Sequence, residues 1–353
     1  MIPPKLCPGD EIRIIAPAVS LAAISGDVRK LAQKRLQDLG FKVTFSKHIE
    51  ERDDFDSSSI PSRVEDIHDA FTDKNVKAIL TATGGFNSNQ LLKYLNYKLI
   101  KKNPKIICGY SDITALNNAI YKKTGLITYT GPDFLDFGMV QGFEYTLDYF
   151  QKCLMNKENK ENKRSFEIIP SLQWSDDHWW DDQQNRKFIE NKGPLIINQG
   201  TPARQGTLAH LGNLAHKRTP AENVEGILIG GNLSTLNLLQ GTEFMPQLKK
   251  AILFIEDDEE AHKHMFNRYF QSLAQLPDFK KVRGLVIGRF QLASKMTDEL
   301  LVKMIKATKE LENLPVIINA DFGHTTPQFT FPIGGKVRIS VKEGKASMVI
   351  LEH

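Results

Sequence analysis

Cysteine, long apolar runs and C-x-x-C pairs are scarce or missing in this sequence. The 353 residues include three cysteines, Cys7, Cys108 and Cys153. Such a sparse, odd set argues against a disulfide framework, and the lack of a C-x-x-C pair argues against a structural zinc site. No apolar stretch approaches the roughly 18 residues that a membrane helix needs. We therefore expect no bound metal and no membrane-spanning helix.

An excess of charge of one sign is also lacking. The chain has 46 Lys and Arg against 42 Asp and Glu, for a formal net charge of +4. Nucleic-acid binding usually needs a concentrated basic face, so we expect no nucleic-acid partner. The N-terminus has no basic segment followed by a clean apolar one, and Pro3, Pro4 and Pro8 would interrupt a signal peptide. We expect a cytoplasmic protein.

The first half of the chain alternates apolar strand patterns with amphipathic helix patterns. This alternation predicts βαβ units, and hence a mostly parallel sheet with helices on both faces. Ser62 and Glu65, just after Pro61, form a capping-box signature that predicts the start of one helix. The expected strands are 11–17, 41–45, 77–83, 105–108 and 126–129, and the expected helices are 27–39, 62–71, 88–95 and 112–121.

A charged, low-complexity stretch, Asn156 to Arg164 (NKENKENKR), is typical of a solvated linker. It predicts an N-terminal parallel-sheet α/β domain over 1–155, a linker and Trp-rich loop over 156–205, and a smaller C-terminal mixed α/β domain over 206–353. Beyond the linker we expect strands 226–230, 251–255, 284–287 and 316–319, helices 234–239, 262–276 and 298–311, and a hairpin of 336–341 with 346–351. The fold class is therefore α/β.

Ser111 is the sharpest candidate for a nucleophile. The apolar strand Ile106–Cys108 ends at Gly109, and Ser111 lies at the turn into the next helix. A strand–turn–helix of this kind exposes a hydroxyl at the sheet edge and directs helix N–H groups at whatever it attacks. The alternative is that Ser111 or Asp112 only caps the helix, and the motif alone favours that reading. Cys108 is a rival nucleophile, although its apolar strand favours a buried thiol.

Two glycine pairs follow predicted strands. Gly84-Gly85 leaves backbone N–H groups free, so Gly85 could supply half of an oxyanion hole, with the amide of Asp112 as the second donor. A tight turn is the equal alternative. Gly230-Gly231-Asn232 lacks the lysine and the spacing of phosphate-binding loops, which disfavours a nucleotide cofactor. We interpret it as a turn that lines the site.

An acid and a histidine occupy the same kind of position as Ser111. Glu256 is the first acid after the apolar strand 252–255, where it could orient an imidazole. The alternative without a function is that Glu256 belongs to an acid-rich, solvated helix start. His324 lies in a Gly/Thr/Pro loop after the strand at 316–319. Active sites of parallel sheets lie at the carboxyl ends of the strands. The three side chains are therefore candidates for a Ser–His–acid triad.

Five motifs along the chain give it a resemblance to a known family. They are Thr83-Gly84-Gly85, Gly109-Tyr110-Ser111-Asp112-Ile113-Thr114, Gly230-Gly231-Asn232-Leu233, Phe254-Ile255-Glu256-Asp257 and Asp321-Phe322-Gly323-His324. In this order they resemble the serine LD-carboxypeptidases, a family that includes the microcin C self-immunity proteins. The resemblance covers nearly the whole chain.

The resemblance implies roles for individual residues. Ser111 would be the nucleophile, His324 the general base and Glu256 the residue that orients it, with the amides of Gly85 and Asp112 as oxyanion hole. It also implies an N-terminal parallel-sheet domain joined to a smaller C-terminal domain, a homodimer, and no metal or other cofactor.

The substrate expected from the resemblance is a small peptide or an aminoacyl nucleotide. One branch of the family removes terminal D-alanine from muropeptide tetrapeptides, and the other cleaves aminoacyl nucleotides of the microcin C type. The stretch Trp174–Asp182 (WSDDHWWDD) resembles the immunity branch, so we expect Trp179 and Trp180 to contact substrate. We expect the same of Asn232, which belongs to the glycine turn that lines the site. The equal alternative is that these rings pack the loop against the second domain. A non-catalytic ligand-binding protein is a further hypothesis. We also expect a basic residue near the site to bind a substrate carboxylate.

Overall fold

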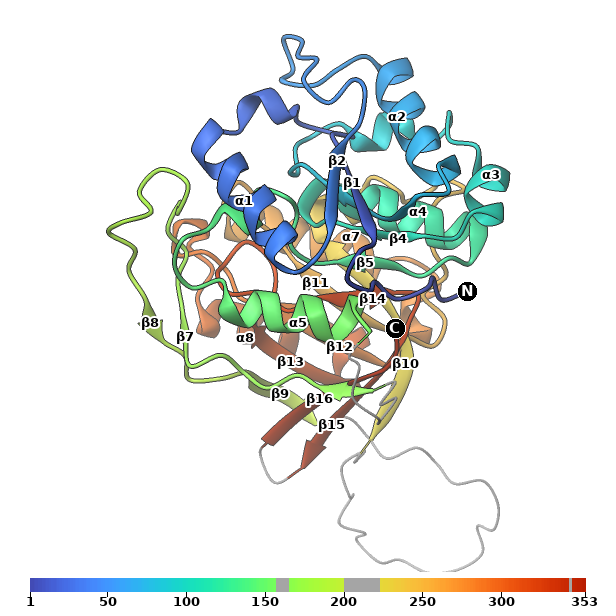
Figure 1. The fold of residues 1–353 in the computed structure, drawn as a ribbon. Coiled ribbons are helices and arrows are strands. Elements are labelled where there is room, and N and C mark those ends of the chain that lie inside the picture. The colour runs from blue at the N-terminus through green and yellow to red at the C-terminus, as the bar shows by residue number, and fades with distance from the viewer. Residues whose placement is uncertain (157–164, 200–222, 343–344) are drawn as a thin grey trace, which may run out of the picture.

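The computed structural model describes residues 1–156, 165–199, 223–342 and 345–353. These residues form a six-stranded sheet, an eight-stranded sheet and a short two-stranded pair, with helices packed against the two large sheets (Figure 1). The expected α/β class, with parallel strands in both halves, is confirmed.

The N-terminal sheet has the strand order β14-β5-β4-β3-β1-β2, in which all neighbours except β14 and β5 are parallel. Its strands are β1 (Glu11–Ile15), β2 (Lys42–Phe45), β3 (Val76–Thr81), β4 (Ile106–Cys108), β5 (Thr128–Thr130) and β14 (Phe331–Ile333). The helices are α1 (Gly26–Asp38), α2 (Ile60–Thr72), α3 (Tyr97–Lys102), α4 (Thr114–Thr124) and α5 (Glu144–Leu154).

Helices cover both faces of this sheet, as expected. Alternate strand residues point to opposite faces, so Ile106 packs in one apolar cluster and Ile107 in another. The first cluster includes the apolar faces of α1 and α5, and the second those of α2 and α4. The second cluster continues into the other sheet through α4, which contacts β10 and α6.

The C-terminal sheet is mixed, with the order β6-β16-β15-β10-β11-β12-β13-β9. Strands β10 to β13 are parallel to one another, and the outer strands pair antiparallel. The strands are β6 (Phe166–Glu167), β9 (Leu195–Gln199), β10 (Val224–Asn232), β11 (Ala251–Glu256), β12 (Gly284–Gly288), β13 (Pro315–Ala320), β15 (Lys336–Lys342) and β16 (Lys345–Glu352). Its helices are α6 (Leu233–Asn237), α7 (Lys263–Ala274) and α8 (Asp298–Ala307), and β7 (Gln173–Trp174) pairs with β8 (Ile189–Glu190).

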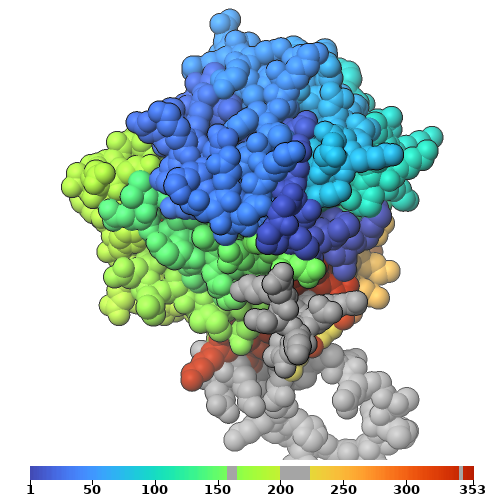
Figure 2. Space-filling view, in the orientation of Figure 1, coloured from blue at the N-terminus to red at the C-terminus, as the bar shows by residue number. Residues whose placement is uncertain are grey.

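The two halves are interlocked rather than consecutive. Strand β14, from the C-terminal half, pairs with β5 in the N-terminal sheet, with Phe331 opposite Thr130. Within the segment expected to be a linker, β6 and β9 add strands to the C-terminal sheet. Figure 2 shows residues 165–199, in yellow-green, beside the N-terminal half. Parts of the predicted linker and of the 206–353 domain, 157–164 and 200–222, and part of the hairpin turn, 343–344, lie outside the described residues.

Local helical structure differs from the sequence expectation in three places. Helix α2 begins at Ile60, and its N-cap is Ser59, whose hydroxyl accepts from the amide of Ser62 at 3.2 Å. The predicted capping box of Ser62 with Glu65 is therefore wrong, because Pro61 fits the first turn and moves the cap upstream. Residues 88–91 and 111–113 form short 3₁₀ helices. None of the described helices is both long and apolar enough to cross a membrane.

The cap at Ser59 gives a stability prediction. Ser59→Ala removes the acceptor for a first-turn amide of α2, which should lower the free energy of unfolding by about 1 kcal/mol. Ser62→Ala leaves that cap in place and should cost less. Urea denaturation of both variants measures the difference, and a larger loss in Ser62→Ala would contradict the assignment of the cap.

Candidate active site

Three strand ends bring the predicted triad residues together. Ser111 follows β4, Glu256 is the last residue of β11, and His324 follows β13. The hydroxyl of Ser111 lies 2.9 Å from Nε2 of His324, and Nδ1 of His324 lies 2.7 Å from Oε2 of Glu256. Ser111 comes from the N-terminal sheet and the other two from the C-terminal sheet, so the site spans both.

Ser111 does not cap the helix that it begins. Tyr110 is the N-cap residue of this 3₁₀ helix and makes no side-chain cap bond. Ser111 has a φ of +59°, a left-handed conformation that non-glycine residues adopt rarely and that is found in sharp nucleophile turns. The carboxylate of Asp112 accepts from the amide of Ser88 at 2.8 Å instead of capping its own helix. The Ser111 hydroxyl therefore faces the imidazole.

The imidazole of His324 is strongly coupled to the acid beside it. Burial disfavours the imidazolium, but the adjacent Glu256 carboxylate outweighs this effect and raises the pKa of His324 to about 9. Glu256 is itself only 2% exposed. In the neutral histidine, Nδ1–H donates to Glu256, which leaves Nε2 free to accept the Ser111 hydroxyl proton. This arrangement can carry out general-base activation of a serine.

The glycine turn lies directly against Ser111. A Cβ atom added at Gly84 would sit 2.9 Å from Cβ of Ser111 and 3.7 Å from the amide nitrogen of Asp112. Gly85, whose φ is +150°, packs as closely against Ala18 and Val19. The turn therefore approaches Ser111 as an oxyanion loop must, and only residues without a side chain fit there.

The rival nucleophile is sequestered. Cys108 is 1% exposed, and its thiol contacts the carbonyl of Pro132 at 3.6 Å. Burial raises the pKa of this thiol well above its usual value, so it remains protonated and unreactive at neutral pH.

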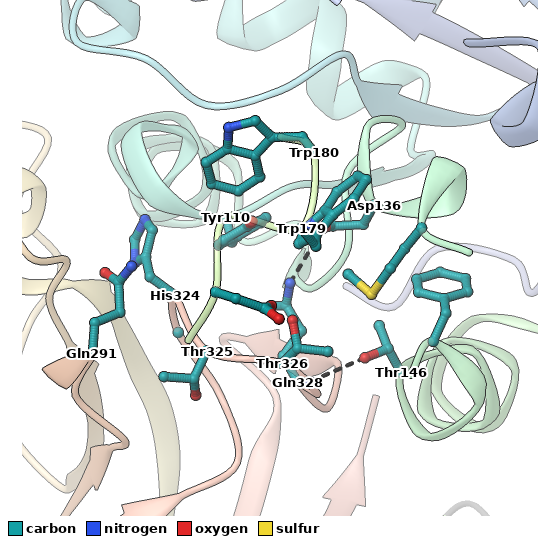
Figure 3. A pocket seen from close by; sticks show the side chains of 14 residues that line it. Tyr110, Asp136, Thr146, Trp179, Trp180, Gln291, His324, Thr325, Thr326 and Gln328 are labelled. Carbon is teal, nitrogen blue, oxygen red and sulfur yellow. Dashed lines mark hydrogen bonds between the residues drawn. The ribbon is translucent and has the colours of Figure 1, made fainter. Parts of the chain in front are cut away.

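A cleft of about 430 Å³ opens in front of Ser111 and His324. One wall is apolar and comes from the loop before α1, α1 itself and the loop after β5, with Ile24, Val28 and Leu135. A smaller pocket of about 60 Å³ shares Tyr110, Trp180 and His324 with this cleft (Figure 3). No lysine or arginine is among the described residues that line either space. The basic group expected for a substrate carboxylate is therefore not among them.

The three tryptophans of the segment 165–199, which joins the two halves of the chain, have different surroundings. Trp179 is 3% exposed and packs in the core of the N-terminal half, although one edge borders the smaller pocket. Trp180 is 48% exposed, lines both the cleft and the smaller pocket, and stacks on His178 with ring centroids 5.0 Å apart. The ring of Trp174 lies under the guanidinium of Arg289, 4.9 Å away. Trp180 is thus the ring available for stacking on a ligand.

Asn232 is held inside the protein. It is 2% exposed. Its side-chain oxygen accepts from the backbone amide of Thr235 at 3.0 Å, as the cap of α6, and its side-chain NH₂ group donates to Asp257 at 3.0 Å. It lines neither the cleft nor the smaller pocket. The structure therefore gives this residue a capping role beside the acid that follows Glu256.

Tyr110 is a site residue that the sequence analysis did not single out. Its ring lies 5.4 Å from the His324 ring, centroid to centroid, and it borders both the cleft and the smaller pocket. The sequence feature that could have indicated this role is the position of Tyr110 directly before Ser111. The apolar wall at Ile24, Val28 and Leu135 had no such signal, because its residues come from separate loops and a helix.

The two-sheet fold and the hydrogen-bonded serine, histidine and glutamate are the arrangement expected of an α/β serine hydrolase. Residues 12–131 match the model of the LD-carboxypeptidase N-terminal domain, and residues 225–339 match that of the LD-carboxypeptidase C-terminal domain. The chain belongs to the LD-carboxypeptidase family, and it is a hydrolase of that family's peptidase type.

Several relatives match over most of their length. The Bacillus subtilis protein named "Putative carboxypeptidase YocD" is 50% identical over 99% of both chains. The microcin C7 self-immunity protein MccF of Escherichia coli is 32% identical over 86% of this chain and 83% of its own. Among solved structures, an MccF-like protein from Bacillus anthracis strain Ames has a TM-score of 0.90 and 52% identity over 100% of both chains.

The pKa of His324 gives a pH prediction. With the neutral imidazole of His324 as the expected base, kcat/KM should rise with pH and level off as His324 loses its proton near the pKa of about 9. Glu256→Gln removes the charge that raises this pKa, so the midpoint should move toward acid while the plateau falls about 10⁴-fold. A pH–rate profile of both proteins measures this, and an unchanged midpoint in the variant would contradict it.

The contact between Gly84 and Ser111 gives a second prediction. The added methyl of Gly84→Ala would force the glycine turn away from Ser111, and we expect kcat to fall by about 10²-fold or more, the usual cost of disturbing an oxyanion hole. Gly26→Ala, whose Cβ would meet nothing within 4 Å, is the matched control. Steady-state kinetics compare the two variants. Wild-type turnover in Gly84→Ala would contradict the expectation that the close contact of Gly84 with Ser111 matters for catalysis.

Proposed function

We propose that this protein is a serine amidase in which Ser111, His324 and Glu256 form the catalytic triad. The observation that carries the proposal is the chain of hydrogen bonds of 2.9 and 2.7 Å that joins the three side chains. His324 takes the proton of Ser111 as its oxygen attacks the amide carbonyl, and Glu256 stabilises the imidazolium. The proton then passes to the leaving nitrogen, the C–N bond breaks, and water hydrolyses the acyl-enzyme.

The backbone amides of Gly85 and Asp112 complete this mechanism as the oxyanion hole. The closeness of the glycine turn to Ser111 supports this role, because both amides belong to segments that touch the nucleophile. Such donors stabilise the charge that develops on the carbonyl oxygen in a site that excludes water.

The substrate class that we favour is an aminoacyl nucleotide of the microcin C type. MccF, whose solved structure superposes on this chain with a TM-score of 0.83 and 29% identity over the superposed residues, has been crystallised with aspartyl sulfamoyl adenosine. Trp180 supports a similar ligand here, since a half-exposed indole at the edge of the cleft can stack on a base. The apolar residues Ile24, Val28 and Leu135 that also line the cleft suit an uncharged ring.

Release of D-alanine from muropeptide tetrapeptides is the second candidate. The family match to LD-carboxypeptidases favours it, as does a murein tetrapeptide carboxypeptidase of Pseudomonas aeruginosa among the relatives, at 24% identity over 94% of this chain. The described lining of the cleft offers no lysine or arginine for the terminal carboxylate, nor for the side-chain carboxylate of an aspartyl nucleotide, so this feature does not separate the two candidates.

The two candidates are separated by their products. The purified protein is given aspartyl sulfamoyl adenosine and a muropeptide tetrapeptide in parallel, and mass spectrometry follows free aspartate and D-alanine. We expect aspartate from the nucleotide, and a loss of several orders of magnitude in rate with Ser111→Ala. D-alanine alone would favour the second candidate, and full activity of Ser111→Ala would refute the serine mechanism.

Trp180→Ala tests the stacking platform. Loss of the indole should raise KM for the nucleotide substrate, by the roughly 1–3 kcal/mol that base stacking supplies, with kcat little changed. Trp174→Ala is the matched control, because that ring packs under Arg289 rather than lining the cleft. An equal effect of both variants on KM would mean that the rings only support the fold.

A further inference from the structure

The loop that carries His324 is fastened at its first residue, Asp321. This carboxylate is 3% exposed and accepts three sets of hydrogen bonds. They come from the Arg289 side chain at 2.8 Å, the amide nitrogen of Ser171 at 2.8 Å and the side chain of Asn191 at 2.9 Å. Two of the three donors belong to the segment that joins the two halves of the chain.

Arg289 is fixed as firmly as the carboxylate that it binds. The residue is 8% exposed, and its Nη2 atom also donates to the side-chain oxygen of Asn191 at 2.8 Å and to the carbonyl of Asn319 at 3.2 Å. Its guanidinium lies over the ring of Trp174. Asn191 therefore bonds to both members of the buried ion pair of Arg289 and Asp321. Such additional hydrogen bonds fix the geometry of a buried ion pair.

A second attachment lies on the other side of His324. Ser175 and Thr326 exchange two backbone hydrogen bonds, of 2.7 and 2.8 Å. The loop is thus held before and after His324 by residues 171–191. These residues fall between the two ranges that match the family models, 12–131 and 225–339.

The loop needs such support because of its own conformation. Gly323, next to His324, has a φ of +106°, and a Cβ there would lie 2.6 Å from the carboxylate of Glu256. The backbone is therefore packed directly against the acid that orients the imidazole. A small shift of this loop would lengthen both hydrogen bonds of His324, and misplacements of about 1 Å can cost about 10²-fold in rate.

We propose that Asp321, held by Asn191 and Arg289, is a positioning residue for His324, and that the segment 171–191 thereby takes part in catalysis through the base. The inference rests on the proposed function in one respect, that His324 is the general base. Neither Asp321 nor Asn191 lines the cleft or the smaller pocket, so they act on the imidazole and not on the substrate.

The test compares Asn191→Ala and Asp321→Asn with the wild-type protein. We expect kcat to fall by about 10²-fold and KM to stay within about two-fold, because geometry at the base is lost while the cleft is intact. Labelling of Ser111 by a fluorophosphonate should slow in parallel, since it needs the same base. Asn185→Ala, on the same segment but with its side chain bonded to Asp182 at the surface, should match wild type in both measurements.

If Asp321→Asn folds poorly, exchanging the side chains of residues 191 and 321 provides a second test. The double variant Asn191→Asp with Asp321→Asn restores one carboxylate and one amide beside Arg289, and should recover most of the lost kcat. Wild-type kcat in Asn191→Ala while Ser111→Ala is inactive would overturn the positioning role and leave the proposed function standing. A rise in KM alone would also overturn it. Activity in Ser111→Ala would instead overturn the proposed function.

Discussion

The hydrogen bond between Ser111 and His324 is the interaction on which the rest of this structure depends. It is 2.9 Å long and crosses from one sheet to the other. Neither half of the chain can form it alone, because the serine follows β4 and the histidine follows β13. Everything that fixes the two sheets relative to each other therefore also fixes the distance between the Ser111 hydroxyl and the His324 imidazole.

Several features of the fold serve this constraint. Strand β14 enters the N-terminal sheet only a few residues after His324, so the chain that carries His324 is anchored in the sheet that carries Ser111. Helix α4, which follows Ser111, packs against β10 and α6 of the other half. The side chain of Asn118 on this helix donates to the carbonyl of Gly230 at 2.8 Å. The two halves share one continuous apolar core, and a shared core resists the sliding that would separate the pair.

Much of the fold could be predicted from local pattern. The buried strands of both sheets appear as short apolar runs, and α1 appears as an apolar stripe that ends before Gly40, because burial on a sheet or a helix face imposes those periods. The cap of α2 was misplaced, since several serines near Pro61 could fill that role. The strand pairings of β6, β9 and β14 had no local signal, because pairing is decided by partners far away in the sequence.

The sequence by itself determined which residue types stand at the strand ends: a serine in a sharp turn, a glycine pair, a glutamate and a histidine. Parallel topology places such ends along one edge of a sheet, so their grouping within each half follows from the pattern. Only the tertiary structure decided that Trp180 borders the cleft while Trp179 is buried, and that Asn232 caps a helix. It also decided that the segment after residue 165 braces the His324 loop. Exposure and long-range hydrogen bonds depend on how two sheets pack, and no local periodicity encodes that packing.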